Sequence, residues 1–388
     1  MTGSVDRTPV VIAARRSPIG TAGHALAGVD LVGLLAPVLR ALVDDLGPDA
    51  PGVDEVVIGN CWGPGGNPAR VAALAAGLGT GVPAVTVDRQ CGSGQEAVHQ
   101  AATAVLAGTV DLVLAGGAES ASTAPWRLAR PSTATGVPVP YERAPLAPPE
   151  IGDPDMGPAA EAVAALCGVS RERQDAYAAR SHVLTLAAAR AGAFEAELVP
   201  VAGMVSDERP RQLTEAVLSR LRPAFVPGGT VTAGNCCGVS DGAAAVAIVP
   251  AYLREALGVP GLALRGWVSV GLDPNTPGLG PVPAVTKLLR GLGIGLAEVG
   301  VVEMTEAFAA QVLACTDALG LDPLGSDAAR VCPQGGAIAM GHPWGASGAM
   351  LLVRLFAQMV REDGPRLGIA TCAIGGGQGL ALLAERVG

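Results

Sequence analysis

Short apolar segments alternate with Ala-rich segments of helical period near the start of the chain and again near its end. A brief apolar run bounded by turn residues predicts a buried strand, and apolar positions three and four residues apart predict a helix. The first part of the chain predicts strands at 8–14, 54–58, 84–88 and 111–117 and helices at 30–46, 68–76 and 94–106. This alternation is typical of a layered α/β fold.

The pattern changes in the middle of the chain. Residues 121–160 are rich in Pro, Ser and Thr and lack a clear period, which predicts a long excursion over the surface. Residues 158–192 have helical spacing, and Ser170 is the predicted N-cap of the helix that starts there. After residue 260 strands and helices alternate again, so the sequence predicts an α/β half, an insertion and a second α/β half.

Composition and charge narrow the classes of function. Hydrophobic residues make up 49% and charged residues 16%, which excludes a disordered chain. The net charge is −9 and no basic stripe occurs, which argues against a nucleic-acid partner. No signal peptide and no membrane span are predicted, and eight cysteines without secretory features indicate reduced thiols in the cytoplasm. The cysteine spacing does not predict a metal site.

Four Gly-rich segments carry the candidate chemistry. Cys91 lies in DRQCGSGQEAV (88–98), between a predicted strand and helix, where the helix dipole should lower its pKa and favour the thiolate. His342 lies in GGAIAMGHPWGASGAM (335–350) and could deprotonate Cys91 or donate to an oxyanion. A buried cysteine at a crowded turn and a histidine that caps a helix are the structural alternatives. The other two segments are TCAIGGGQG (371–379), whose backbone N–H groups could face an anion, and GTVTAGNCCGVSDGAAA (229–245).

Six segments resemble the signature segments of the thiolase superfamily, in the order and at the spacing of that family. They are CGSG (91–94), GGAES (116–120), GTVTAGN (229–235), EAFAAQ (306–311), GGAIAMGHPWGASGA (335–349) and GGGQG (375–379). The resemblance implies a five-layered α-β-α-β-α sandwich of two similar halves with an inserted loop domain. On this basis the predicted N-terminal half is 1–120 and 230–260, the loop domain is 121–229, and the C-terminal half is 261–388.

The resemblance also implies roles for single residues. Cys91 would carry an acyl group as a thioester, His342 would activate it, and the N–H groups of Cys91 and Gly375 would bind an oxyanion. Glu306 would be a supporting polar residue. The predicted contacts with coenzyme A, the substrate carrier, are Met156, Arg211, Phe225, Cys237 and Gly238. A family member of this kind needs no permanently bound cofactor, uses acyl-CoA, and forms homodimers or homotetramers. For Arg211, a solvated loop arginine is the alternative.

The chain departs from the family at three places. The family's second catalytic cysteine stands directly before the IGGG turn, where this sequence has Ala373, and Cys372 comes one residue early. Because side chains alternate along a strand, Cys372 should face away from Cys91 unless a bulge turns it back. Thr305 replaces an Asn or His that helps to hold a water. Cys236 and Cys237 replace Ala-Ser; Cys237 could be a substitute acid–base or could merely fill space.

These changes leave three interpretations. The chain is a working thiolase with Cys372 or another group recruited; or a specialised acyltransferase or condensing enzyme that needs no second cysteine; or a catalytically silent partner subunit. The intact Cys91 and His342 count against the third. The sequence therefore predicts a CoA-dependent acyltransferase of the type that works by Claisen condensation or by thiolysis of a 3-ketoacyl-CoA, and the first two interpretations both stay open.

Overall fold

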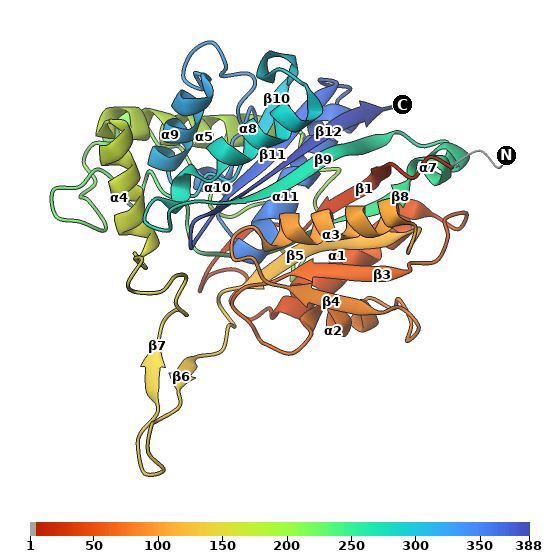
Figure 1. The fold of residues 1–388 in the computed structure, drawn as a ribbon, viewed down its shortest axis with the longest axis horizontal. Helices are drawn as coiled ribbons and strands as arrows, with labels where there is room; N and C mark the ends of the chain where they lie inside the picture. Colours follow the sequence, from red (N-terminus) through yellow and green to blue (C-terminus); the bar gives the residue numbers. More distant parts are fainter. Residues whose placement is uncertain (1–4) are drawn as a thin grey trace.

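The computed structural model describes residues 5–388. Nine of its strands form one continuous path in the order β10-β11-β12-β9-β1-β8-β5-β3-β4 (Figure 1). Those of the N-terminal half are β1 (Pro9–Arg16), β3 (Glu55–Gly59), β4 (Ala84–Val87), β5 (Val113–Ser120) and β8 (Ser240–Pro250), and the two-residue β2 (Gly20–Thr21) pairs with β8. Those of the C-terminal half are β9 (Gly261–Gly271), β10 (Val301–Met304), β11 (Leu367–Ile374) and β12 (Gln378–Val387).

The two halves meet at β1 and β9, which pair antiparallel over only Val10–Ala263 and Val11–Leu262. Each half has its own mixed sheet: β3 pairs parallel with β4 and β5, and β10 pairs parallel with β11. The short junction leaves the two sheet halves free to lie on either side of a shared helical layer.

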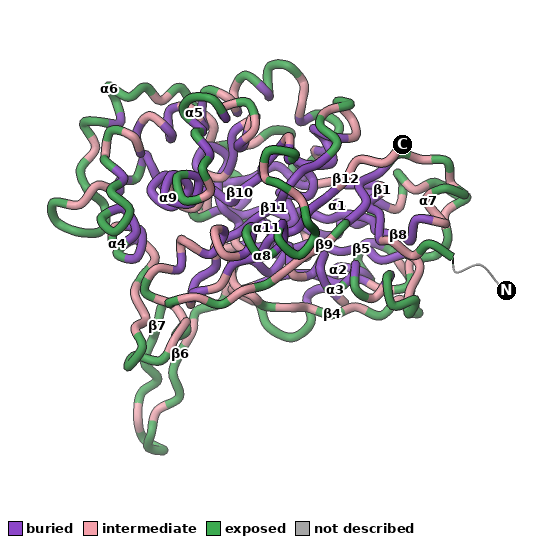
Figure 2. The backbone as a smooth tube through the Cα atoms, turned by 45° about the horizontal axis from the view of Figure 1, so that its top comes forward, coloured by how far each residue is buried: buried purple, intermediate pink, exposed green. Residues whose placement is uncertain are grey.

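That shared layer consists of α3 (Ser93–Ala107) and α11 (Trp344–Phe356). Val98 of α3 and Leu352 of α11 belong to one buried cluster together with Val246 of β8 and Leu382 of β12, so the central core touches both sheet halves. The outer faces are covered by α1 (Leu31–Leu46) and α2 (Pro68–Ala75) on one side and by α8 (Pro281–Leu292) and α9 (Ala309–Leu319) on the other. The five layers and the α/β class predicted from the sequence are confirmed, and the burial follows them (Figure 2).

Glycines let α3 and α11 approach each other to backbone contact. A Cβ at Gly94 would lie 2.7 Å from the carbonyl oxygen of Gly345, and one at Gly348 would lie 2.5 Å from the backbone nitrogen of Gln95. Each helix thus presents a glycine to the backbone of the other. The first turns of the two helices, which follow Cys91 and His342, are therefore held side by side.

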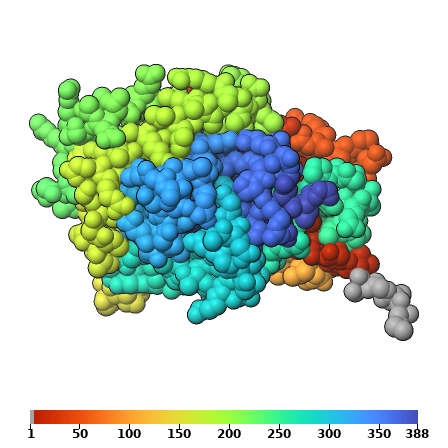
Figure 3. All heavy atoms as spheres, turned by 90° about the horizontal axis from the view of Figure 1, so that it is seen from above, coloured from red at the N-terminus to blue at the C-terminus, as the bar shows by residue number. Residues whose placement is uncertain are grey.

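The inserted segment contains a projecting arm and a helical part. The arm is a hairpin of β6 (Arg127–Ala129) and β7 (Val139–Tyr141) that extends from the body (Figure 1). The predicted helical stretch 158–192 is two helices, α4 (Met156–Cys167) and α5 (Arg171–Arg190), separated at Gly168, whose φ is 65°. Ser170 is confirmed as an N-cap, because its Oγ accepts from the Arg173 N–H at 3.3 Å. Both helices pack on α9 of the C-terminal half (Figure 3).

The remaining helices are short. They are α6 (Glu215–Leu218), α7 (Ala251–Leu257) and α10 (Ala337–Met340), with single turns at Pro277–Leu279 and Leu296–Glu298 and a π-turn at Ala357–Arg361 that continues α11.

Candidate active site

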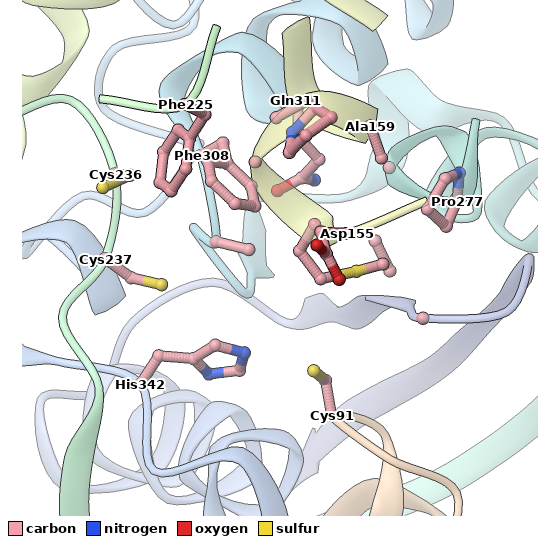
Figure 4. A pocket seen from close by; sticks show the side chains of 18 of the residues that line it. Cys91, Asp155, Ala159, Phe225, Cys236, Cys237, Pro277, Phe308, Gln311 and His342 are labelled. Carbon is pink, nitrogen blue, oxygen red and sulfur yellow. The ribbon is translucent and has the colours of Figure 1, made fainter. Parts of the chain in front are cut away.

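A cavity of about 540 Å³ lies where the two halves and the inserted segment meet (Figure 4). Most of its wall is apolar, and Cys91, Cys237 and His342 lie on the same side of it in Figure 4. Residues from all three parts of the chain contribute to the lining; they include Cys91, Met156, Phe225, Cys236, Cys237, Phe308, Gln311, His342, Trp344, Ala373, Ile374 and Gly375. The wall therefore forms only when the three parts are assembled.

Cys91 sits two residues before α3 in a turn that is fixed by its neighbours. Gln90 has a φ of 47°, and its N–H donates to Asp88 Oδ1 at 2.7 Å. Ser93 Oγ donates to the Gln90 carbonyl at 2.6 Å and accepts from the Arg89 N–H at 2.8 Å. Gly92 has no room for a side chain, since a Cβ there would lie 2.5 Å from Ile374 Cδ1. These contacts direct the thiol into the cavity.

The environment of Cys91 contradicts the expectation that the helix dipole lowers its pKa. Burial raises the pKa of the Cys91 thiol well above its ordinary value, and the nearby Cys372 and Cys237 raise it further. Burial is the largest of these causes, because an ionised sulfur is poorly solvated in an apolar cavity. Cys91 is therefore a thiol at rest, and it needs a base in order to react.

His342 faces the same cavity from the loop before α11. Its Nδ1 lies 2.6 Å from Ser347 Oγ, and Ser347 Oγ donates its proton to the Pro343 carbonyl at 3.1 Å. Because the serine proton is used there, Nδ1 must be the donor and carry the imidazole proton. Nε2 then has a free lone pair, and no described residue bonds to it, although it is buried. Burial lowers the pKa of His342 to about 4, so the ring is neutral.

A thiol and a neutral imidazole in one apolar cavity can form an activated nucleophile. Comparison with known proteins identifies the scaffold that carries them. The sequence model of the thiolase N-terminal domain matches residues 9–252, and that of the thiolase C-terminal domain matches 259–386. The chain belongs to the thiolase family.

Relatives of known name match this chain over almost its full length. An acetyl-CoA acetyltransferase of Pseudomonas aeruginosa is 42% identical over 396 residues, covering 97% of this chain and 99% of its own. The crystal structure of the Bacillus anthracis acetyl-CoA acetyltransferase superposes with a TM-score of 0.91 at 35% identity, covering 99% and 100% of the two chains. Human mitochondrial 3-ketoacyl-CoA thiolase gives 0.88 at 32% identity, covering 98% and 99%. The chain is thus a thiolase-type acyltransferase.

The residues directly before the triple-glycine turn differ in their exposure to the cavity. Ala373 lines the cavity of this thiolase, whereas Cys372 does not. Strand β11 pairs with β12 without a bulge, so the alternation of side chains is regular. Cys372 is nevertheless next to the nucleophile, which corrects the expectation that it faces away: its Sγ donates to the Cys91 carbonyl at 3.4 Å and to the Ala373 carbonyl at 3.2 Å. Cys372 packs behind the turn of Cys91, outside the cavity.

Two residues of the EAF region lie behind the cavity wall. Glu306 is fully buried and accepts from Tyr177 Oη at 2.8 Å, Ser181 Oγ at 2.7 Å and the Ile338 N–H at 3.1 Å. It therefore ties α5 to the C-terminal half, and burial raises its pKa. Thr305 is also buried and lines a separate small cavity of about 20 Å³, which includes Ser347.

The predicted coenzyme A contacts divide into two groups. Met156, Phe225 and Cys237 line the cavity, and Phe225 packs edge-on against Phe308 with ring centroids 6.1 Å apart. Gly238 and Arg211 do not line it. The Gly238 carbonyl accepts from the His342 N–H at 3.0 Å, so that glycine positions the histidine. Arg211 is exposed, and its N–H donates to His182 Nδ1 at 3.3 Å.

Three contributors were missed in the sequence. Ser347, which fixes the tautomer of His342, follows it by five residues, and a hydroxyl in the first turns after a His-Pro pair is the signal that could have found it. Trp344 lines the cavity and stacks on Trp62 at 4.6 Å between ring centroids. Phe308 stands inside the EAF segment but was given no role. Trp344 and Phe308 pair with residues far away in the sequence, Trp62 and Phe225, so no local pattern pointed to them.

Metal sites and membrane-spanning helices are both absent from residues 5–388. No cluster of His, Cys, Asp or Glu in this range could hold a metal ion. Likewise, none of the helices in the described part of the chain is long and apolar enough to cross a membrane.

Proposed function

We propose that this enzyme carries an acyl group on Cys91 and uses His342 as its base. The single observation that supports this most is the neutral imidazole, whose unpartnered Nε2 opens into the cavity that holds the Cys91 thiol. His342 Nε2 takes the thiol proton while the sulfur attacks the carbonyl of an acyl-CoA. A thiol whose pKa is raised by burial is a poor nucleophile alone, so the base acts during attack.

The proposed reaction is thiolysis of a 3-ketoacyl-CoA or its reverse, a Claisen condensation. In thiolysis the Cys91 sulfur attacks C3, the C2–C3 bond breaks, and the acyl group remains on sulfur. Coenzyme A then takes the acyl group and releases Cys91. The N–H groups of Cys91 and Gly375 are proposed to bind the oxyanion, with Glu306 and Thr305 supporting the wall from behind. Glu306 has no free oxygen for substrate, since three donors occupy it.

Coenzyme A is proposed to reach Cys91 along the side of the cavity formed by the inserted segment. The thioether of Met156 and the edge-to-face pair of Phe225 and Phe308 form an apolar wall suited to the pantetheine arm. Arg209 and Arg211 are neighbours on the segment that leads to Cys237, and the ion pairs of the described residues include neither of them with a carboxylate. An unpaired arginine there could offset the phosphate charge of the nucleotide.

A second candidate is supported by Ala373. With no thiol at that position, the enzyme could pass the acyl group of Cys91 to an amine, an alcohol or a preformed enolate. Such a specialised acyltransferase would acylate Cys91 but would not thiolyse 3-ketoacyl-CoA.

The arm of β6 and β7 supports a further proposal, that two or four copies assemble. Trp126 is 94% exposed and Val137 is 80% exposed, and apolar side chains at such exposure are typical of contact surfaces. Light scattering on the pure protein would measure the mass, and a monomer would contradict the proposal. We keep the cytoplasm as the proposed location, to be checked by cell fractionation.

The test of the main proposal is acylation itself. The protein would be incubated with acetyl- to octanoyl-CoA, acetoacetyl-CoA and malonyl-CoA and followed by intact-mass spectrometry, with free coenzyme A assayed alongside. We expect an acyl adduct that is absent from Cys91→Ala, and turnover that falls by at least about 10⁴-fold in that variant, as for other removed nucleophiles. Failure of every donor to form an adduct would contradict the proposal and favour a silent subunit.

A further inference from the structure

Carbon–carbon chemistry on Cys91 needs a second proton-transfer group. When the C2–C3 bond breaks, the electron pair stays on C2, and that carbon must receive a proton. His342 already holds the proton taken from Cys91. Ala373, where the thiolase family has its second cysteine, has none to give. Another acid must therefore face the cavity if the chain performs the proposed reaction, on which this inference rests.

The titratable residues of the cavity wall are few. Besides Cys91 and His342 they are Asp155, Cys236 and Cys237. Asp155 pairs with Arg143 at 2.8 Å, and its side chain is 76% exposed, so it belongs to the rim. The Cys236 side chain packs in a buried apolar cluster and points away from the cavity centre in Figure 4. Cys237 is therefore the remaining candidate for the second proton-transfer group.

Cys237 is held beside the catalytic histidine by the backbone. Its N–H donates to the Ala307 carbonyl at 2.9 Å, and the carbonyl of the next residue, Gly238, accepts from the His342 N–H at 3.0 Å. In Figure 4 its thiol points into the cavity, toward the imidazole, with Cys91 on the other side of the ring. The buried Nε2 of His342, which no described residue bonds, opens into the same space and is a second sign that a ligand is handled there.

Cys372 is not placed for this role. Its Sγ is fully buried and donates to the carbonyls of Cys91 and Ala373, and it does not reach the cavity wall. A substrate carbon lying against Cys91 would be separated from it by the backbone of the turn.

We propose that Cys237 is the catalytic acid–base of this enzyme, in place of the cysteine missing at position 373. In thiolysis the Cys237 thiol donates its proton to C2 as the C2–C3 bond breaks, which releases acetyl-CoA and leaves a Cys237 thiolate. That thiolate takes the thiol proton of the incoming coenzyme A. The sulfur of coenzyme A attacks the acyl carbon, the bond to Cys91 breaks, and the imidazolium of His342 returns its proton to Cys91. All groups are then in their starting state.

The resting state fits the first of these steps. Burial raises the pKa of the Cys237 thiol above its ordinary value, so the side chain is protonated at neutral pH and starts as the donor. A buried thiolate formed during turnover is correspondingly a strong base toward the thiol of coenzyme A.

The experiment compares acylation with thiolysis in the same variants. We expect Cys237→Ala to form acyl-Cys91 from acetyl-CoA by intact mass, while its thiolysis of acetoacetyl-CoA falls by about 10²–10⁴-fold, the usual loss on removing a general acid–base. Cys237→Ser keeps the size of the side chain, and we expect a similar loss because a hydroxyl is a far weaker acid than a thiol. Cys315→Ala removes a buried thiol outside the cavity and should retain full thiolysis.

A rescue separates chemistry from packing. Adding Ala373→Cys to Cys237→Ala returns a thiol to the cavity wall at another position, and we expect thiolysis to recover by at least about 10-fold. Thiolysis by Cys237→Ala within about two-fold of the parent protein, or a large loss in Cys372→Ala instead, would overturn the assignment of Cys237. A parent protein that acylates Cys91 but never thiolyses would overturn it too and leave acyl transfer standing. A parent protein without any adduct would overturn the proposed function as well.

Discussion

The starts of α3 and α11 are alike in construction and opposite in chemistry. Gly and Ser residues lie in the first turns of each helix, and each helix presents a glycine, Gly94 or Gly348, to the other's backbone. Before α3 stands Cys91, whose pKa is raised by burial, and before α11 stands His342, whose pKa is lowered by burial. The same physical cause thus leaves a neutral donor on one side and a neutral acceptor on the other.

The difference shows how one scaffold used twice yields a reactive pair. A thiolate–imidazolium pair of Cys91 and His342 would be poorly solvated in an apolar cavity. The two side chains therefore stay uncharged until the Cys91 sulfur attacks a substrate carbonyl. On the α11 side, Ser347 fixes the tautomer of His342 that leaves its Nε2 free. The α3 side needs no such partner, because a thiol has a single proton.

Removing the proton acceptor, His342, should have the largest effect on the reactivity of Cys91. In His342→Ala no base remains for the Cys91 thiol, and we expect kcat/KM to fall by about 10²–10⁴-fold at neutral pH. The loss should shrink as the pH rises, because solution then supplies the thiolate. The pH profile of acylation measures this. His24→Ala, which removes an exposed histidine, is the control, and a similar loss in both variants would sink the assignment.

Separating the two helices should have the next largest effect. In Gly348→Ala the new Cβ would meet the Gln95 backbone nitrogen at 2.5 Å, and backbone cannot yield as a side chain can. We expect the free energy of unfolding to fall by about 1–3 kcal/mol, the usual cost of overpacking, with a disproportionate loss of acylation rate. Urea unfolding and intact mass measure the two.

Gly291→Ala in α8 is the matched control for that change, since nothing lies within 4 Å of a Cβ there. It should gain about 0.4–1 kcal/mol through the unfolded state. Equal changes in the free energy of unfolding in the two alanine variants would contradict the close backbone contact between α3 and α11.

The last prediction concerns the dependence of stability on pH. The folded pKa of His342 is about 4, and that of His182 is also about 4, both lowered first by burial. The unfolded chain, whose histidines titrate near 6.5, binds protons sooner as the pH falls. Stability should therefore decrease from pH 6.5 toward 4, by an amount on the order of 1–2 kcal/mol per histidine at pH 5. Urea midpoints at pH 7, 6 and 5 check this, and a flat profile would contradict it.

Local patterns predicted much of this fold and less of its site. Periodicity gave the strands and helices of both halves, and the N-cap at Ser170, because these depend on neighbours in sequence. The Gly-rich segments singled out Cys91 and His342 as candidates, and similarity to the family supplied the roles predicted for them. The sign of the pKa shift at Cys91 was predicted wrongly, since the dipole is local but burial depends on Ile374 and other residues far along the chain. The contact between Cys372 and the Cys91 carbonyl was missed for the same reason.

The crossing of Gly94 and Gly348 also has a consequence for how the chain folds. These residues are more than half the chain apart, so the contact closes a very long loop and must wait until both halves are synthesised. Before it closes, Cys91 belongs to an incomplete half, where water can reach it and its acidity is that of an ordinary thiol. We therefore expect the Cys91 thiol of a nascent chain to lack its base, His342, and to be more accessible to oxidants than the same thiol in the completed fold.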